Sequence, residues 1–159
     1  MRMRWKPKGM RLARYLWALP TTCVALPLVF AALATHGRLA VVDGVLEVQG
    51  GAVRWFLRHG MLFQYGVVAL TLGHIVLGQD QRCLDRARAH ERVHVKQCER
   101  WGVFFIPAYL LASLWALLRG QHYYYGNAFE REAFDAEIHN ARRCRAVVSH
   151  GTYKRRADS

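Results

Sequence analysis

The cysteines of this 159-residue chain are few, and their spacing suggests no shared structural role. None of the four belongs to a C-x-x-C pair, so a structural zinc ribbon is not indicated, and neither is a disulfide framework. The chain also lacks internal repeats and low-complexity segments. Its length fits a single domain with room for a short anchor.

Acidic side chains are scarce as well: 11 Asp and Glu residues accompany 23 Lys and Arg, giving a net charge of +12. A basic chain invites a nucleic-acid partner, but no recognisable nucleic-acid-binding motif is present. The basic residues gather at residues 2–14, directly before an apolar run, and again at residues 142–156. Basic residues beside an apolar run mark the cytoplasmic side of a membrane segment. We therefore expect membrane lipids as partners, and no nucleic acid.

Residues 15–35 carry no charge, and the run is long enough to span a bilayer. Pro20 and Pro27 predict a kinked or re-entrant helix. A cleaved signal peptide is the alternative, since Ala32-Leu33-Ala34 resembles a cleavage site. The run is longer than a typical signal-peptide core, which favours a retained anchor and a membrane location. We divide the chain into an anchor (1–36), a folded domain (37–150) and a basic tail (151–159).

The next segments contain the signals of a small sheet. Residues 39–42 and 45–48 flank Asp43-Gly44, which predicts a hairpin with a type I′ turn. Residues 52–59 are ambiguous and favour a short helix. Residues 67–77 predict one strand, with Gly73 and His74 inside it.

His90-Glu91-Arg92-Val93-His94 is the most informative stretch, because its two histidines are four residues apart. Asp80 predicts an N-cap, and no Pro or Gly follows until Gly102, so a helix over residues 81–101 is predicted. Both imidazoles then lie on one helix face. Two such nitrogens can bind one zinc ion, and the adjacent glutamate can act on a metal-bound water.

The least charged stripe of this helix passes through both histidines, which predicts that they point inward. The stripe consists of Cys83, Ala87, His90, His94, Cys98 and Trp101. Cys98 lies one turn beyond His94, where it is either an alternative soft ligand or, as we favour, a small buried side chain. The competing interpretation of the motif is an accidental pair of histidines on an exposed helix.

A catalytic zinc ion needs a third protein ligand, and a second predicted helix beginning near residue 127 offers two. Either Glu130 or Glu132 can supply the carboxylate. Glu130 also has a purely structural interpretation, because Asn127-x-x-Glu130 fits an N-cap followed by a capping-box acid. The spacing alone leaves both interpretations open.

His90-Glu91-x-x-His94 followed by Glu130-x-x-Ala133 resembles the gluzincin family of zinc metallopeptidases, in which a second helix carries the third ligand in an E-x-x-A motif. The strings at residues 71–78, 90–97 and 127–133 are similar to short, mostly uncharacterised bacterial gluzincin-like proteins, and the resemblance covers residues 39–137. It implies His90, His94 and Glu130 as zinc ligands and Glu91 as general base. Many gluzincins have Asp where this chain has Phe134. No counterpart of their oxyanion-stabilising His or Tyr is evident.

The resemblance implies an α+β, mainly helical fold with a minimal zincin-like core. We expect a small antiparallel sheet, an active-site helix, a Glu-bearing helix and an N-terminal transmembrane helix. The implied activity is hydrolysis of a peptide or protein substrate by a zinc-activated water at the bacterial cytoplasmic membrane. An inactive zinc-binding scaffold and a small basic membrane protein without metal are the alternatives.

Further residues are candidates for supporting roles. Gln97, Asp135 and Glu137 are expected to orient the ligands. Zinc peptidases bind the substrate backbone along a strand beside the active-site helix, and the segment containing Gly73 and His74 is the candidate for that strand.

Residues 102–118 are a second apolar stretch, just long enough to cross a bilayer core. A full crossing would put His94 and Glu130 on opposite sides of the membrane, where they cannot share a metal ion. A zinc site therefore requires this segment to be buried, re-entrant or interfacial. The aromatic loop at residues 122–125 is expected to anchor at the membrane interface, with an oxyanion role as the alternative.

Overall fold

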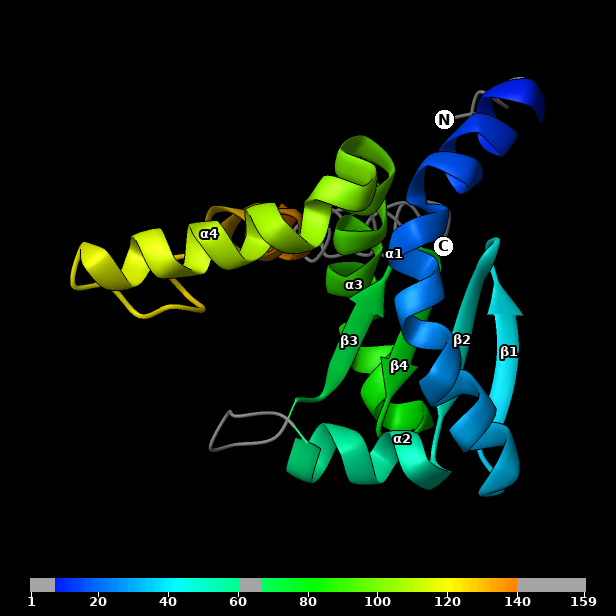
Figure 1. The fold of residues 1–159 in the computed structure, drawn as a ribbon. Coiled ribbons are helices and arrows are strands. Elements are labelled where there is room, and N and C mark those ends of the chain that lie inside the picture. The colour runs from blue at the N-terminus through cyan, green and yellow to red at the C-terminus, as the bar shows by residue number, and fades with distance from the viewer. Residues whose placement is uncertain (1–7, 61–66, 140–159) are drawn as a thin grey trace, which may run out of the picture.

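A computed structural model describes residues 8–60 and 67–139 (Figure 1). The predicted mainly helical α+β class is confirmed. The elements are α1 (Lys8–Ala34), β1 (Arg38–Val42), β2 (Val45–Gln49), α2 (Gly51–Trp55), the π-helical turn η1 (Phe56–Gly60), β3 (Ala69–Leu72), β4 (Ile75–Gly78), α3 (Gln81–Trp101), the 3₁₀ turn η2 (Gly102–Phe104), α4 (Phe105–Leu118) and a helix at residues 128–139. The predicted basic tail and Cys144 lie outside the described residues.

The four strands form one mixed sheet in the order β1-β2-β4-β3. The β1–β2 and β3–β4 pairs are antiparallel, whereas β2 and β4 are parallel. The prediction of an antiparallel sheet is therefore wrong at the central pair. The physical reason is the long connection through α2 and η1, since parallel strands require a crossover of a dozen or more residues.

Both hairpins depend on residues with positive φ at their turns. Asp43 and Gly44 have φ of 50° and 79°, as the predicted type I′ turn requires. The single strand predicted at residues 67–77 is wrong, because the chain reverses at Gly73, whose φ is 64°. The short helix predicted at residues 52–59 is confirmed by α2 and η1.

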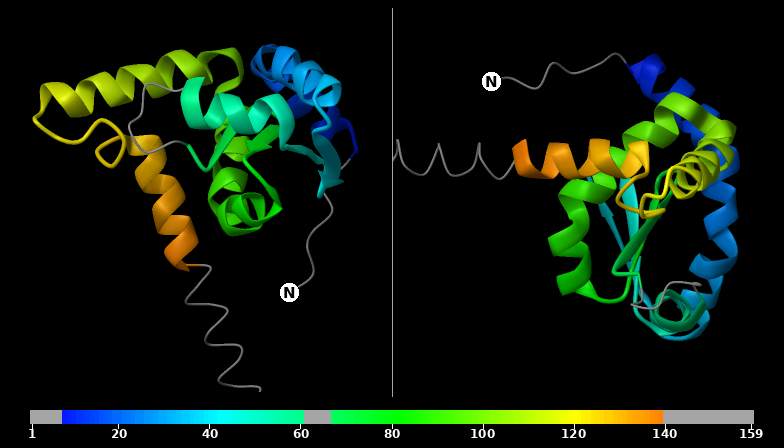
Figure 2. Two further views of the ribbon diagram at one scale, coloured as in Figure 1. Left: turned by 90° about the horizontal axis from the view of Figure 1, so that it is seen from below. Right: turned by 90° about the vertical axis from the view of Figure 1, so that its left-hand side faces the viewer.

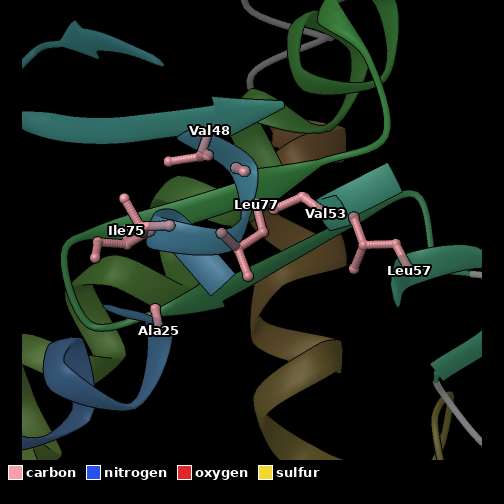
Figure 3. Close-up of a cluster of buried hydrophobic side chains, with 8 residues drawn as sticks. Ala25, Val48, Val53, Leu57, Ile75 and Leu77 are labelled. Carbon is pink, nitrogen blue, oxygen red and sulfur yellow. The ribbon is translucent and has the colours of Figure 1, made fainter. Parts of the chain in front are cut away.

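The central strand β4 is buried on both faces. Ile75 and Leu77 point toward α1, α2 and η1, where they pack with Ala25, Val53 and Leu57 (Figure 3). Val76 points the other way and packs against α3. Alternate side chains of β4 thus pack into two different hydrophobic clusters, which explains why the sequence of β4 is apolar throughout.

Helix α1 belongs to this fold rather than standing apart from it. Ala25, Val29 and Ala32 share one core cluster with the sheet. Ala25 and Ala32 are fully buried, and their small side chains let α1 approach the sheet closely. The segment that we assigned to a separate anchor, residues 1–36, therefore contributes to the same core as the predicted domain.

The chain changes direction sharply at Gly102, between α3 and α4 (Figure 1). Gly102 has φ of 57°, and a Cβ atom there would collide with the ring of Trp17. Thr21 Oγ1 donates a 2.9 Å hydrogen bond to the carbonyl oxygen of Gly102. The turn directs α4 away from α3, and the chain then returns so that the helix at residues 128–139 reaches α3.

Candidate metal centre

Helix α3 carries the two histidines and begins as the sequence predicts. The side chain of Asp80 accepts a 2.9 Å hydrogen bond from the backbone N–H of Cys83, so Asp80 is the N-cap. His90, His94 and Cys98 are buried along the predicted stripe. Trp101, the last residue of that stripe, is 41% exposed. It is the last residue of α3, at the end where the helix gives way to the turn at Gly102.

Asn127 fixes the start of the second ligand-bearing helix. Its Oδ1 accepts from the backbone N–H of Phe129 at 2.9 Å, and its Nδ2 donates to the carbonyl oxygen of Tyr109 and to Ser113 Oγ. Asn127 is fully buried, so these bonds hold the helix start firmly against α4. The N-cap prediction for Asn127 is confirmed.

Glu130 then lies on the inner face of this helix. Its carboxylate contacts the imidazoles of His90 and His94, while the backbone N–H of Asn127 donates to the carbonyl oxygen of Tyr124. The capping-box interpretation of Glu130 is therefore wrong. Glu132 is not the third ligand either, because it pairs with Gln97 and Arg100.

Three ligand-type atoms converge between the two helices. His90 Nε2 lies 3.1 Å from His94 Nε2 and 3.1 Å from Glu130 Oε2, and His94 Nε2 lies 3.4 Å from Glu130 Oε1. All three side chains are buried and form a group that can hold a metal ion. Tetrahedral ligands bound to a zinc ion at about 2.1 Å are separated from one another by about 3.4 Å. The observed spacing matches that geometry.

A partner outside the group orients each ligand. His94 Nδ1 lies 2.8 Å from the acceptor Gln97 Oε1, a contact that favours the tautomer presenting Nε2 to a metal. Gln97 is fully buried and also donates to the carbonyl oxygen of Phe129, so it ties α3 to the second helix. His90 Nδ1 lies 3.8 Å from Glu137 Oε2. Gln97 and Glu137, two of the residues expected to orient the ligands, thus lie beside the two histidines.

The third predicted supporting residue, Asp135, is exposed. No hydrogen bond or ion pair joins it to the described ligand side chains, so its predicted role is wrong. The reason is its place on the helix: five positions after Glu130 it points away from α3.

Glu91 lies beside this group, and a strand holds its carboxylate. Thr71 Oγ1, on β3, donates a 2.6 Å hydrogen bond to Glu91 Oε2. Glu91 is 6% exposed, and burial raises the pKa of its carboxyl group. A buried carboxylate whose affinity for protons is raised suits a general base.

The charged side chains of the site shift one another's pKa values. Burial alone would raise the pKa of Glu130, but the hydrogen bonds from His90, His94 and Tyr109 outweigh it and hold that pKa well below its ordinary value. Burial likewise opposes the charged imidazole of His94, yet the carboxylates of Glu130 and Glu91 raise its pKa. Glu130 therefore keeps its negative charge, which a bound cation can neutralise.

The structure places two predicted substrate-strand residues elsewhere. Gly73 and His74 occupy the β3–β4 turn, where the backbone N–H of His74 donates to Thr22 Oγ1 on α1. The ring of His74 stacks on Tyr15 at 4.0 Å between centroids, and its Nε2 lies 3.3 Å from Glu99. His74 is thus a core residue with a ring partner and an acidic partner, and the strand that contacts Glu91 is β3.

Cys98 is a core residue as well. It packs with Ala18, Phe105 and Phe129, and burial raises the pKa of its thiol to about 12. It is not among the residues that converge on the candidate site. The prediction of a small buried side chain is confirmed.

Sequence reasoning missed Tyr109, and it assigned Tyr124 to the aromatic loop, with an oxyanion role only as the alternative. The Tyr109 hydroxyl donates to Glu130 Oε1 at 2.6 Å. Burial and the nearby carboxylate of Glu130 together raise the pKa of Tyr124. Tyr109 stands in an apolar segment that gave no sign of polar chemistry. No spacing rule connects it to Glu130.

No protein-family model matches the chain, and no curated protein or solved structure matches it either. The resemblance to gluzincins thus rests on the residues alone.

Proposed function

We propose that this protein is a gluzincin-like zinc metallopeptidase with a minimal zincin-like core. One observation carries the proposal: His90, His94 and Glu130 converge at metal-binding distances beside the buried carboxylate of Glu91. Two imidazoles and a carboxylate are the protein ligands typical of catalytic zinc in metallopeptidases. Zinc is preferred over magnesium or calcium because imidazole nitrogens supply two of the three ligands.

Zinc bound by these residues supplies Lewis acidity, which lowers the pKa of a water and polarises the scissile carbonyl. Glu91 takes the proton from the attacking water and passes it to the leaving amine. Thr71 Oγ1 keeps the carboxylate of Glu91 in place through its 2.6 Å hydrogen bond. Gln97 keeps the His94 imidazole in the tautomer that binds metal through Nε2.

The substrate is a peptide or protein segment in extended conformation. β3 is an edge strand of the sheet, and its Thr71 bonds Glu91, so an edge strand lies next to the candidate site. An extended peptide can pair with such an edge through backbone hydrogen bonds. This assigns the substrate-binding role to β3 instead of the turn at Gly73.

The proposed location is the bacterial cytoplasmic membrane. Two helical segments, Leu12–Ala34 and Gln81–Leu118, are long and apolar enough to cross a membrane by length and composition. The net charge of +12 suits an anionic lipid surface.

The deciding experiment measures zinc per chain by elemental analysis and cleavage of a casein substrate. The wild type is expected to bind one zinc per chain, and His94→Ala and Glu130→Gln to lose it. Asp135→Asn is the matched control on the same helix and keeps zinc, because Asp135 is exposed. Glu91→Gln keeps zinc and loses cleavage. A wild type that stays free of zinc after zinc is added back would refute the metal site. Zinc without any effect of Glu91→Gln would indicate a scaffold.

A further inference from the structure

Helix α4 presents an apolar outer face that the rest of the described fold leaves uncovered. Its exposed side chains recur every three or four residues, and no charged residue occurs in residues 101–118. Six of the large ones, each between 51% and 72% exposed, are Phe104, Leu110, Leu111, Leu114, Trp115 and Leu118. Exposed apolar faces of this extent mark an interaction site.

Helix α1 presents a second face of the same kind. Its inner side chains pack on the sheet, while residues 15–34 contain no charge on either side. The outer face includes Leu16, Leu19, Val24, Leu26, Phe30 and Leu33, with exposed fractions from 37% to 66%. A core helix of a water-soluble domain ordinarily turns polar side chains outward, and α1 does not.

The two apolar faces belong to the same side of the molecule. Both views in Figure 2 show α1 and α4 toward one side, with α3 and the helix at residues 128–139 toward the other. In Figure 1 the two helices run in different directions, α1 down the view and α4 across it. Thr21 on α1 bonds to Gly102 in η2, the turn that leads into α4, which ties α1 to the base of α4. We call the outer faces of α1 and α4 together the α1–α4 surface.

Neither helix can cross a bilayer while the fold stays intact. The inner face of α1 packs against an open sheet with edge strands β1 and β3, and open edges are not tolerated in hydrocarbon. The other face of that sheet carries Glu47, paired with Arg88 at 2.9 Å. The 14 residues of α4 span about 21 Å, less than the bilayer core of about 30 Å.

Charge favours a lipid surface over a second copy of the chain. The net charge of +12 makes two copies repel and attracts each to anionic headgroups. Two arginines flank the apolar residues. Arg14, near the start of α1, is partly exposed and pairs with Glu99 at 3.1 Å. Arg119, at the end of α4, is exposed. The Arg119 guanidinium lies 4.9 Å from the ring of Trp115, where its stem can cover apolar surface while its head reaches phosphates.

We propose that the α1–α4 surface inserts into a single leaflet of an anionic bilayer, and that neither helix spans it. The protein is then held flat on one side of the membrane. The proposal does not depend on a bound metal, and its test reads membrane binding alone.

The test is flotation of the full-length protein with vesicles of equal parts phosphatidylglycerol and phosphatidylcholine. Leu111→Glu on α4 and Phe30→Glu on α1 are each expected to weaken partitioning of the protein onto the vesicles on the order of tenfold. Each substitution removes an apolar side chain that the leaflet would otherwise bury. Ile138→Glu is the matched control, because Ile138 is 51% exposed on the opposite helix. Circular dichroism of each variant shows that the fold persists. Unchanged partitioning of both variants would overturn the proposal.

A second measurement separates insertion from crossing. Single cysteines at the exposed positions Arg100 and Gln121, before and after α4, are introduced into a variant whose native cysteines are replaced by serine or alanine. Each is treated with a membrane-impermeant thiol reagent in sealed vesicles. Labelling of both from the same side supports the proposal, and labelling from opposite sides overturns it. A stable dimer in solution that Leu111→Glu dissociates, with vesicle binding unchanged, would assign the surface to a second copy and also overturn it.

Discussion

The hydroxyl of Tyr109 donates a 2.6 Å hydrogen bond to Glu130 Oε1, so α4 contacts the candidate metal centre directly. A bilayer crossing by this segment would have separated His94 from Glu130, but in the structure α4 instead orients Glu130. The inner face of α4 carries this contact, and its outer face is the α4 part of the α1–α4 surface.

Tyr109→Phe tests this contact. Removing the hydroxyl leaves Glu130 less well oriented, and we expect zinc affinity to fall by about 10- to 100-fold. The measurement is competition for zinc against a chelator of known affinity. Tyr125→Phe serves as the control, since Tyr125 is 64% exposed. Equal affinities in the wild type and Tyr109→Phe would show that the hydrogen bond has no role in metal binding.

Gln97→Leu removes the acceptor of the His94 Nδ1 hydrogen bond and the donor to the carbonyl oxygen of Phe129. Two buried polar groups lose their partner, so we expect the free energy of unfolding to fall by about 1–3 kcal/mol. Zinc affinity should fall as well, because the imidazole is free to rotate. Urea unfolding with and without zinc measures both effects. Gln121→Leu, at an exposed position, should change neither.

Removing the metal tests the centre without mutation. A ligand that binds only the folded protein stabilises it by about 2.7 kcal/mol when present at 100 times its Kd. Addition of a chelator should therefore lower the Tm of the wild type. His94→Ala should show the same Tm with chelator and with zinc, because one ligand is missing. An identical response of the two proteins would locate any bound zinc elsewhere.

Glu47 tests the packing of α3 on the sheet. It is 4% exposed and accepts hydrogen bonds from Arg88 at 2.9 Å, with Arg92 at 3.4 Å. Glu47→Gln removes the carboxylate charge that faces Arg88 and Arg92, while Arg88 keeps its ion pair with Asp85 at 2.8 Å, so we expect a loss of about 1–3 kcal/mol in the free energy of unfolding. Arg100→Gln, which breaks an exposed ion pair with Glu132, should cost less than about 1 kcal/mol. Thermal or urea unfolding compares the two variants.

Gly73 and Gly120 form a matched pair for the β3–β4 turn. Both have positive φ, of 64° and 69°. A Cβ atom at Gly73 collides with Thr22, whereas nothing lies within 4 Å of one at Gly120. Both Ala variants bear backbone strain of about 1–2 kcal/mol, and only Gly73→Ala adds about 1–3 kcal/mol of overpacking. Equal losses of unfolding free energy in the two variants would show that Thr22 on α1 moves to make room for the new Cβ atom.

The sequence alone determined the local elements with strong signals. Asp80 and Gly102 bound α3 as predicted, and Asp43-Gly44 forms the predicted turn. These features depend on a few neighbouring residues: a side chain that caps an N–H, or a residue that tolerates positive φ. The spacing of His90 and His94 likewise fixed their common face, because helix geometry alone decides it.

Only the tertiary structure decided how distant segments meet. Glu130 and Glu132 are equivalent by spacing, and packing against α3 chose Glu130. Three further features join residues 20 or more positions apart in the chain. They are the contact of Tyr109 with Glu130, the contact of Thr71 with Glu91, and the parallel pairing of β2 with β4. The same is true of α1, whose apolar run predicts a membrane span but whose small residues pack on the sheet. Local sequence encodes the propensity of each segment, whereas the partners of a buried face are set by the packing of the whole chain.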